Sequence, residues 1–181
     1  MALHYYFCCI PKEENNMMEL QTRVSFLVFF LASTSTLHFS MASRSTHQEF
    51  VDAHNKVRQP LGLPPVSWSF RVMLYAKAYA EKLRAQNCPM KHSTGPFGEN
   101  LAKASWNMNA TEAVNMWAKE VKDYNYGANS CTPGAMCGHY TQLVWKDSVN
   151  IGCAKIKCPD GFTFVTCNYD PPGNYVGEKP Y

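Results

Sequence analysis

The chain has 181 residues, a length that suits one domain preceded by a leader. It carries 17 Lys and Arg against 14 Asp and Glu, a net charge of +3, and these charges are scattered without a basic run. This pattern disfavours nucleic-acid binding and leaves room only for weak attraction to anionic surfaces.

Residues 1–45 have the pattern of an N-terminal extension followed by a secretory signal peptide. Arg23 precedes an apolar run at residues 24–32, and small residues follow at 40–43. Because a helix needs roughly 20 apolar residues to cross a bilayer, the run is too short for a transmembrane segment. Its order is typical of a cleaved signal. We therefore expect a secreted protein without a transmembrane anchor, with a short membrane anchor as the alternative.

The remaining residues, 46–181, contain all the cysteines except Cys8 and Cys9. An even set of cysteines in a secreted domain predicts a disulfide framework, although the sequence alone does not choose among the pairings. No C-x-x-C pair occurs, so neither a zinc ribbon nor a thioredoxin-type motif is expected. The cysteines concerned are Cys88, Cys131, Cys137, Cys153, Cys158 and Cys167.

Two helices are predicted in the first half of the domain. The first should run from Thr46 to about Arg58 and end before Pro60, with His54 as a hydrogen-bonded packing residue on its inner face. The second should cover residues 70–86, because apolar side chains recur there at helical spacing. A loop rich in glycine and proline, residues 88–100, is predicted to follow.

A third helix is predicted from about Ala110 to Tyr124, and Asn109 with Glu112 offers a capping arrangement at its start. Asn109 also opens the sequon Asn-Ala-Thr, which makes it a candidate for N-glycosylation in a secreted chain. The chain then ends in three runs predicted to be strands: residues 139–145, 150–157 and 162–168. Helices first and strands last indicate an α+β domain.

Glu120 breaks the pattern of the third helix. On a helical wheel it falls beside Ala113 and Trp117, at the edge of the apolar arc. A carboxylate is costly to bury without a partner, so Glu120 should meet a cation, a metal, an imidazolium or backbone N–H groups. The alternative is that it lies at the rim of the buried face and reaches water.

Several segments resemble one known family. They are similar to the CAP superfamily of cysteine-rich secretory proteins, antigen 5 and pathogenesis-related 1 proteins, and most of all to its plant pathogenesis-related 1 branch. The segments are residues 54–58, His92-Ser93, Gly98-Glu99-Asn100, Trp117 with Glu120, Gly138–Gln142 within Cys137–Trp145, and Cys167–Tyr175.

The resemblance implies a disulfide-braced, three-layer α-β-α sandwich around a central, mostly antiparallel sheet. It also implies the disulfide pairs Cys88–Cys158, Cys131–Cys137 and Cys153–Cys167. Residues 46–181 would form the CAP domain.

The resemblance further implies a central cleft lined by His92, Glu99, Glu120 and His139. Two imidazoles and two carboxylates suit three roles, and their spacing favours none of them. They can bind zinc or another divalent ion, although no cofactor is required. They can form an acid–base pair with shifted pKa values. They can also form a hydrogen-bonded network that fixes loops over the sheet.

Two further expectations come from the resemblance. CAP proteins are associated with sterol binding, and Trp117, Tyr124 and Tyr126 are the candidate contacts here, with ordinary packing as the alternative. Residues 171–181 resemble a tail that plant members release as a defence peptide, which would require a protease to cut between Asp170 and Pro171. Its prolines and glycines favour an exposed tail, and the alternative is a tail docked on the domain.

Taken together, the sequence predicts a secreted plant defence protein of the apoplast. It would be a monomer that binds sterols or related lipids and acts against fungi or oomycetes. It would not be an enzyme, and it would be the precursor of a C-terminal signalling peptide, residues 171–181. The alternative is a metal-dependent hydrolase that uses the His and Glu side chains of the cleft.

Overall fold

The computed structural model describes residues 46–181, so the expected extension and signal peptide lie outside the described residues. Residues 46–58 are helical and lead into a 3-10 turn, η1, at Gln59–Leu61. The expected end of the first helix is confirmed, because Pro60 falls in this turn. Of the helices in this part of the chain, none has the length and apolar character needed to cross a membrane.

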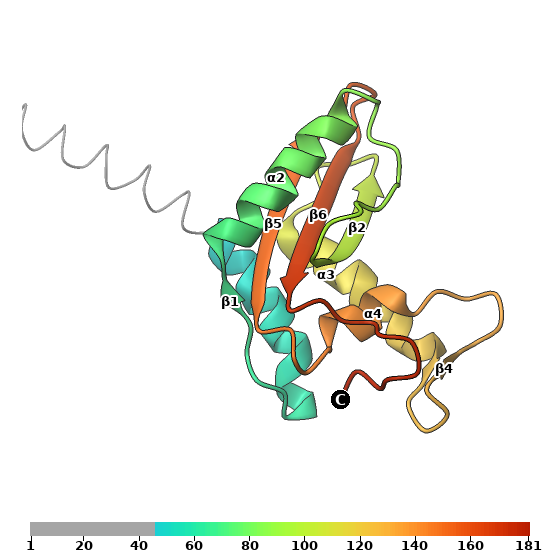
Figure 1. Cartoon of the computed structure of the whole chain (residues 1–181). Coiled ribbons are helices and arrows are strands. Elements are labelled where there is room, and N and C mark those ends of the chain that lie inside the picture. The colour runs from blue at the N-terminus through green and yellow to red at the C-terminus, as the bar shows by residue number, and fades with distance from the viewer. Residues whose placement is uncertain (1–45) are drawn as a thin grey trace, which may run out of the picture. The chain divides into compact units, whose positions relative to one another are not determined.

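A four-stranded sheet forms the centre of the described domain (Figure 1). Its order is β1 (Ser67–Trp68), β5 (Asn150–Lys157), β6 (Thr163–Asp170) and β2 (Gly98–Ala104). β6 pairs antiparallel with both β5 and β2, whereas the short β1 pairs parallel with β5. The predicted mostly antiparallel sheet is therefore confirmed.

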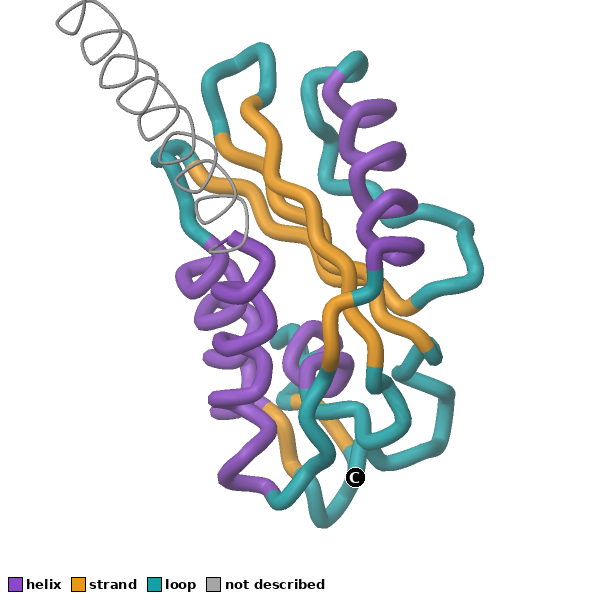
Figure 2. The backbone as a smooth tube through the Cα atoms, turned by 90° about the vertical axis from the view of Figure 1, so that its left-hand side faces the viewer, coloured by secondary structure: helices purple, strands orange, loops and turns teal. Residues whose placement is uncertain are grey.

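Helices cover both faces of this sheet, which gives the expected three layers (Figure 2). On one face lies α2 (Phe70–Arg84), which begins at the N-cap Ser69 and packs against β5 and β6. Gly152 permits the close approach, because a Cβ added there would lie 2.0 Å from the backbone N of Met73. The first helix, α3 (Ala110–Ala118) and α4 (Gly138–Leu143) lie on the opposite face.

Each face of the sheet has its own apolar core. The α2 side is built from small and medium side chains, and the other side is larger and contains Trp117, Tyr140 and Tyr169. Burial of these side chains is the main stabilising term of the fold. The α2 side contains Ala76, Ala80, Leu83, Cys88, Leu101, Ala154, Cys158 and Phe164.

Within residues 46–181 the disulfides join Cys88 with Cys158, Cys131 with Cys137, and Cys153 with Cys167. These are the pairs that the family resemblance implies. The first bond ties the segment after α2 to the end of β5, and the last crosslinks directly opposed positions of β5 and β6. Cys131–Cys137 closes the loop that leads into α4.

The expectation of a strand at residues 139–145 is wrong, because residues 138–143 form the helix α4. Tyr140 and Leu143 are both buried, three residues apart, as one face of a helix requires. The Thr141 hydroxyl donates to the carbonyls of Cys137 and Gly138, which also favours helical backbone. Bulky and β-branched residues in this short run had favoured a strand.

The third helix is shorter than predicted. α3 ends at Ala118 and continues as the 3-10 segment η2 (Lys119–Asp123). In this more tightly wound segment Val121 is 49% exposed. The chain then forms a small hairpin of β3 (Tyr124–Asn125) and β4 (Ser130–Cys131).

Strand β2 was missed, because the glycines and prolines of residues 88–100 indicated a loop. Its first residues, Gly98 to Asn100, pair with β6 along with the rest of the strand. β2 therefore carries Glu99 on a rigid edge strand rather than on a loop. The backbone of Glu99 is therefore fixed opposite Asn168 of β6.

Candidate functional site

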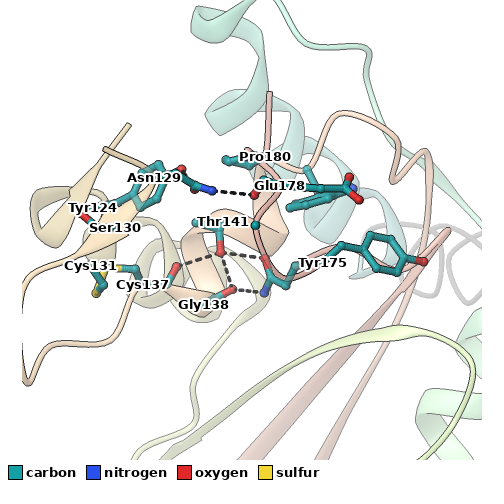
Figure 3. A pocket seen from close by; sticks show the side chains of 13 residues that line it. Tyr124, Asn129, Ser130, Cys131, Cys137, Gly138, Thr141, Tyr175, Glu178 and Pro180 are labelled. Atoms are coloured by element: carbon teal, nitrogen blue, oxygen red, sulfur yellow. Dashed lines mark hydrogen bonds between the residues drawn. A yellow bond between two sulfur atoms is a disulfide. The ribbon is translucent and has the colours of Figure 1, made fainter. Parts of the chain in front are cut away.

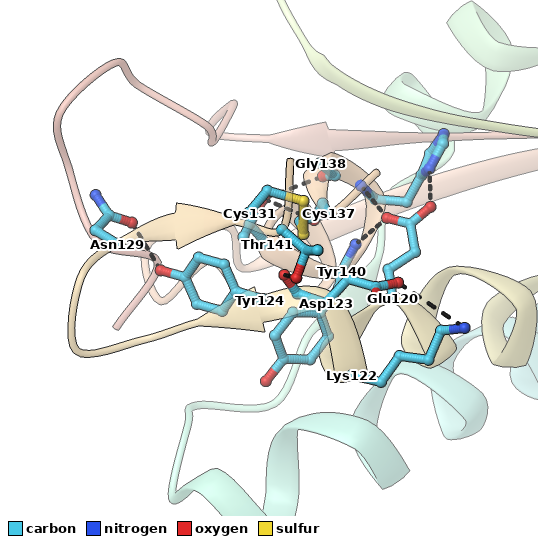
Figure 4. Close-up of a disulfide and its surroundings, with 12 residues drawn as sticks. Glu120, Lys122, Asp123, Tyr124, Asn129, Cys131, Cys137, Gly138, Tyr140 and Thr141 are labelled. Atoms are coloured by element: carbon cyan, nitrogen blue, oxygen red, sulfur yellow. Dashed lines mark hydrogen bonds and ion pairs between the residues drawn. A yellow bond between two sulfur atoms is a disulfide. The ribbon is translucent and has the colours of Figure 1, made fainter. Parts of the chain in front are cut away.

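Glu120 and His139 form a close, half-buried pair. Glu120 Oε1 lies 2.6 Å from His139 Nδ1, and the two side chains are 15% and 18% exposed. Figure 4 shows the Glu120 carboxylate beside the first turn of α4, close to the Cys131–Cys137 disulfide. The partner that sequence reasoning required for Glu120 is thus an imidazole together with backbone donors.

The second oxygen of Glu120 caps α4. Oε2 accepts from the backbone N–H of His139 at 3.0 Å and from that of Tyr140 at 3.3 Å. The N-cap residue, Cys137, makes no side-chain capping bond, so Glu120 satisfies helix donors that would otherwise lack a partner. A negative charge at a helix N-terminus is also electrostatically favourable.

Trp117 lies beside the His139 ring. The two rings are nearly parallel, at 17°, with centroids 6.4 Å apart. The Trp117 indole N–H donates to the carbonyl of Leu101 at 2.9 Å, and the side chain is 2% exposed. Trp117 therefore packs the site from inside and offers no surface for a lipid in this structure.

His92 and Glu99 form a second pair. His92 Nδ1 lies 2.9 Å from Glu99 Oε1, which also accepts from the Ser93 N–H, and Asn168 Nδ2 donates to Oε2. The hydrogen bond to Glu99 raises the pKa of His92 despite partial burial. Burial opposes ionisation of Glu99, but the hydrogen bonds from His92, Ser93 and Asn168 outweigh it and lower the pKa of Glu99. The pair is thus disposed to carry opposite charges.

A buried amide lies between the Glu99 strand and α4. Asn100 Nδ2 donates to the carbonyl of His139 at 3.0 Å and to the hydroxyl of Tyr169 at 3.1 Å. Tyr169 in turn lies 3.0 Å from His54 Nε2, and His54 Nδ1 bonds the carbonyl of Phe50. Burial lowers the pKa of His54 to about 4, so this imidazole is neutral near pH 7. His54 is the hydrogen-bonded packing residue that the sequence predicted.

The four expected cleft residues therefore form two hydrogen-bonded pairs. Among residues 46–181, no three His, Cys, Asp or Glu side chains gather closely enough to hold a metal ion. Both carboxylates are occupied by hydrogen-bond donors. The arrangement fits a network that fixes loops over the sheet, and it does not fit a preformed three-ligand metal site.

The two candidate tyrosines lie in the hairpin that follows η2. The Tyr124 hydroxyl donates to Asn129 Oδ1 at 2.7 Å, and Tyr126 is 40% exposed. Tyr124 also lines a pocket of about 310 Å³ between this hairpin, α4 and the C-terminal tail (Figure 3). Ring faces at the surface beside a pocket can take up flat apolar ligands.

The C-terminal tail, residues 171–181, is irregular but docked. Residues 174–179 are exposed, as expected for a tail, whereas Pro180 is buried and its carbonyl accepts from the Lys146 N–H at 2.7 Å. Asn174 bonds both Thr141 and Gly138 of α4. Sequence reasoning kept a docked tail as its alternative, and the docking shows only in the structure.

The glycosylation candidate Asn109 is exposed at the start of α3. Its side-chain oxygen accepts from the Glu112 N–H, and the Glu112 carboxylate accepts from the Asn109 N–H, so the predicted capping arrangement is present. Thr111 of the sequon is engaged by the carboxylate of Glu49. The sequon therefore spans the N-cap and the first turn of α3.

Comparison with known proteins identifies the family. The profile of the Cysteine-rich secretory protein family, CAP, matches residues 51–169. The chain belongs to the CAP family.

Pathogenesis-related 1 proteins of plants are among its similar relatives. The CAP chain is 48% identical over 156 residues to a pathogenesis-related protein 1 of Arabidopsis thaliana, covering 86% of this chain and 95% of the relative. It is 47% identical over 143 residues to pathogenesis-related protein 1A1 of Solanum lycopersicum, covering 79% and 81%. The predicted pathogenesis-related 1 branch is confirmed.

Solved CAP structures share the fold. The venom allergen-like protein 4 of Schistosoma mansoni is 27% identical and superposes with a TM-score of 0.59, covering 75% of this chain and 93% of that one. The structure of Na-ASP-1 is 25% identical, with a TM-score of 0.65, and the match covers 76% and 41% of the two chains. The three-layer architecture is therefore a shared feature of the family.

Sequence reasoning missed three contributors to the site of this CAP chain. Asn100 and Asn168 are buried amides in strands that connect the two His–Glu pairs to the sheet. Both lie within family-like segments. Asn168, a polar residue in a strand that the sequence predicted, could have been found, whereas the strand that carries Asn100 was not predicted. Tyr181 carried no such signal, because its partners lie far away in the sequence.

Proposed function

We propose that this CAP protein is a secreted defence protein of the pathogenesis-related 1 type that binds sterols or related membrane lipids. Its relatives bear the name pathogenesis-related protein 1, which supports a role in defence. Disulfides persist in oxidising compartments, and this supports an extracellular site such as the apoplast. Action on a fungal or oomycete membrane would then follow from lipid binding.

The observation that carries the proposal is the aromatic loop, residues 124–131. Tyr124 of this loop is half-buried and lines the 310 Å³ pocket, and Tyr126, two residues further on, is exposed. The loop is held at both ends: Glu120 binds α4 just before it, and the Cys131–Cys137 disulfide ties its far end to the start of α4. Such a braced loop presents its rings at low entropic cost.

In this proposal the His–Glu pairs support binding rather than hydrolysis. Glu120 and His139 orient α4 relative to η2, and through them the aromatic loop keeps its position. A hydrolase reading would instead need a water-activating base aimed at an open substrate position. The carboxylates of both pairs already accept hydrogen bonds from neighbouring groups, which favours the supporting role.

The test is flotation of the mature domain with phosphatidylcholine vesicles that contain ergosterol or no sterol. The wild type should bind the ergosterol vesicles more strongly, and Tyr124→Ala with Tyr126→Ala should lower that affinity about tenfold, as expected for lost aromatic contacts. Phe70→Ala is the matched control, because Phe70 is also an exposed aromatic side chain but lies at the start of α2. A wild type that ignores sterol would sink the proposal.

We also propose that residues 171–181 can be released as a peptide by cleavage between Asp170 and Pro171. The exposed middle of the tail supports protease access. The bond itself lies at the end of β6: the Asp170 carbonyl accepts from Val149 N–H and the Pro171 carbonyl from Ser148 Oγ. Cleavage therefore requires this end to open first. Mass spectrometry of the protein after incubation with plant extracellular fluid tests it, and an uncut tail would contradict it.

A further inference from the structure

The tail ends on the aromatic loop. The rings of Tyr181 and Tyr126 are stacked, with centroids 4.7 Å apart and planes at 17°, and the Tyr126 hydroxyl donates to the main-chain oxygen of Tyr181. Lys179 Nζ lies 4.5 Å from the centroid of the Tyr126 ring. One residue of the loop is thus contacted by two side chains of the tail.

Further contacts tie the same tail residues to the surroundings of the loop. The Tyr181 hydroxyl lies 3.3 Å from that of Tyr140, and Asn129 Nδ2 donates to the carbonyl of Glu178 at 3.0 Å, as Figure 3 shows for Asn129. Pro180 is buried and accepts from Lys146. Residues 178–181 therefore cover the Tyr126 ring, one of the two aromatic rings that the proposed function assigns to lipid.

The covering segment is joined to the rest of the tail at a glycine. Gly177 precedes it with φ at +85°, a left-handed backbone conformation, and Val176 is fully exposed. Upstream, the tail has its own anchors on α4, because Gly173 donates to Gln142 Oε1 and Asn174 bonds Thr141. Release of residues 178–181 thus breaks the contacts described above, including those of the buried Pro180, and leaves the upstream anchors in place.

We infer that residues 178–181 act as an autoinhibitory strap, which occupies the aromatic loop with Tyr181 and must lift before a sterol can use the Tyr126 ring. This inference rests on the proposed lipid binding at the loop. When a ligand competes with an intramolecular occupant, its apparent affinity equals the affinity of the open state multiplied by the fraction of molecules that are open. Loss of the strap, by cleavage or mutation, therefore increases the affinity for sterol.

The experiment compares the wild type with a variant that ends at Gly177 and with Tyr181→Ala. Binding to phosphatidylcholine vesicles containing ergosterol should tighten about tenfold in both variants, a coupling of ordinary size for two linked states. Val176→Ser is the matched control, because Val176 lies in the same tail, is fully exposed and should leave affinity unchanged. Equal affinity in wild type and truncated chain overturns the inference.

A second measurement needs no lipid. Nitration of Tyr126 by tetranitromethane, located by mass spectrometry, should be several-fold faster without the strap, because Tyr181 no longer covers the ring. Unchanged nitration overturns the strap itself. If no form binds sterol vesicles while nitration still accelerates, the proposed function fails and the strap stands, with its assignment to sterol refuted.

Discussion

The carboxylate of Glu120 holds both the ring and the backbone of His139. Oε1 lies 2.6 Å from Nδ1 of the imidazole, and Oε2 lies 3.0 Å from the backbone nitrogen of the same residue. One side chain therefore fixes both the start of α4 and the orientation of the His139 imidazole. This makes the pair a positioning device between η2 and α4.

Replacing Glu120 with glutamine should destabilise the domain by about 1–3 kcal/mol, because the neutral amide loses charge-assisted bonds to His139 and Tyr140. Urea unfolding measures the change. Glu81→Gln serves as control, since Glu81 makes only an exposed ion pair with Arg84 and should change stability by much less. Equal losses in the two variants would contradict the capping role.

The His92–Glu99 pair should make stability depend on pH. The pKa of His92 is raised, so its contribution is complete below the ordinary value of 6.5 and fades as pH rises through the folded value. The pKa of Glu99 is lowered, so its contribution is complete above the ordinary value of 4.5 and fades as pH falls through the folded value. The pair therefore contributes most between pH 4.5 and 6.5.

Urea unfolding across this range checks the pH dependence. The stability difference between wild type and His92→Ala should be largest inside the window and shrink on both sides. His47→Ala is the comparison. The His47 ring stacks on Trp68, and within residues 46–181 it forms no ion pair with a carboxylate. A difference that stays constant with pH would show that the pair has no electrostatic role.

The disulfides should differ in their effect on stability. Cys88 and Cys158 are 70 residues apart, whereas Cys131 and Cys137 are 6 apart. Loop entropy then predicts a loss of about 4 kcal/mol for the double serine variant of the first pair and about 2 kcal/mol for the second. Thermal and urea unfolding give these values, and the reverse order would refute the entropic account.

The Cys131–Cys137 variant should nevertheless have the larger effect on lipid binding. This disulfide ends the aromatic loop, while Cys88–Cys158 joins elements around α2. Vesicle flotation at a temperature where both variants remain folded makes the comparison. Equal affinities of the two variants would show that the Cys131–Cys137 disulfide does not support lipid binding.

Asn109 should act as a helix cap whether or not it carries a glycan. Asn109→Ala removes the bond from its side-chain oxygen to the Glu112 N–H and should cost about 1 kcal/mol, whereas Asn109→Ser keeps a cap and should cost little. Both changes remove the sequon, so any glycan is lost equally. The mass of the secreted protein reports the glycan, and equal stability of the two variants would exclude the capping role.

The sequence by itself determined the elements whose signals are local. Residues 150–157, predicted to be a strand, are β5, and the periodic apolar residues after Ser69 form α2. The motif segments around Glu99 and His139 gave the family, and with it the three layers and the disulfide pairs. The requirement that Glu120 have a partner also followed from the cost of burying a carboxylate.

Tertiary contacts decided the rest. Residues 138–143 are a helix because Glu120, far away in sequence, supplies a cap and because Tyr140 and Leu143 find a core on one side. The end of α3 tightens so that Glu120 reaches that cap and Tyr124 can enter a hairpin. Local propensity is worth only a fraction of a kcal/mol per residue, so such long-range contacts override it.

The same reason explains how the four expected cleft residues are arranged. Sequence reasoning assigned His92, Glu99, Glu120 and His139 to one cleft, but only the folded chain showed that they divide into two pairs. Likewise, the composition of the tail favoured exposure, and the stacking of Tyr181 on Tyr126 depends on a surface that exists only after folding. Residue types set which partners each group needs, and the tertiary structure sets which partner is within reach.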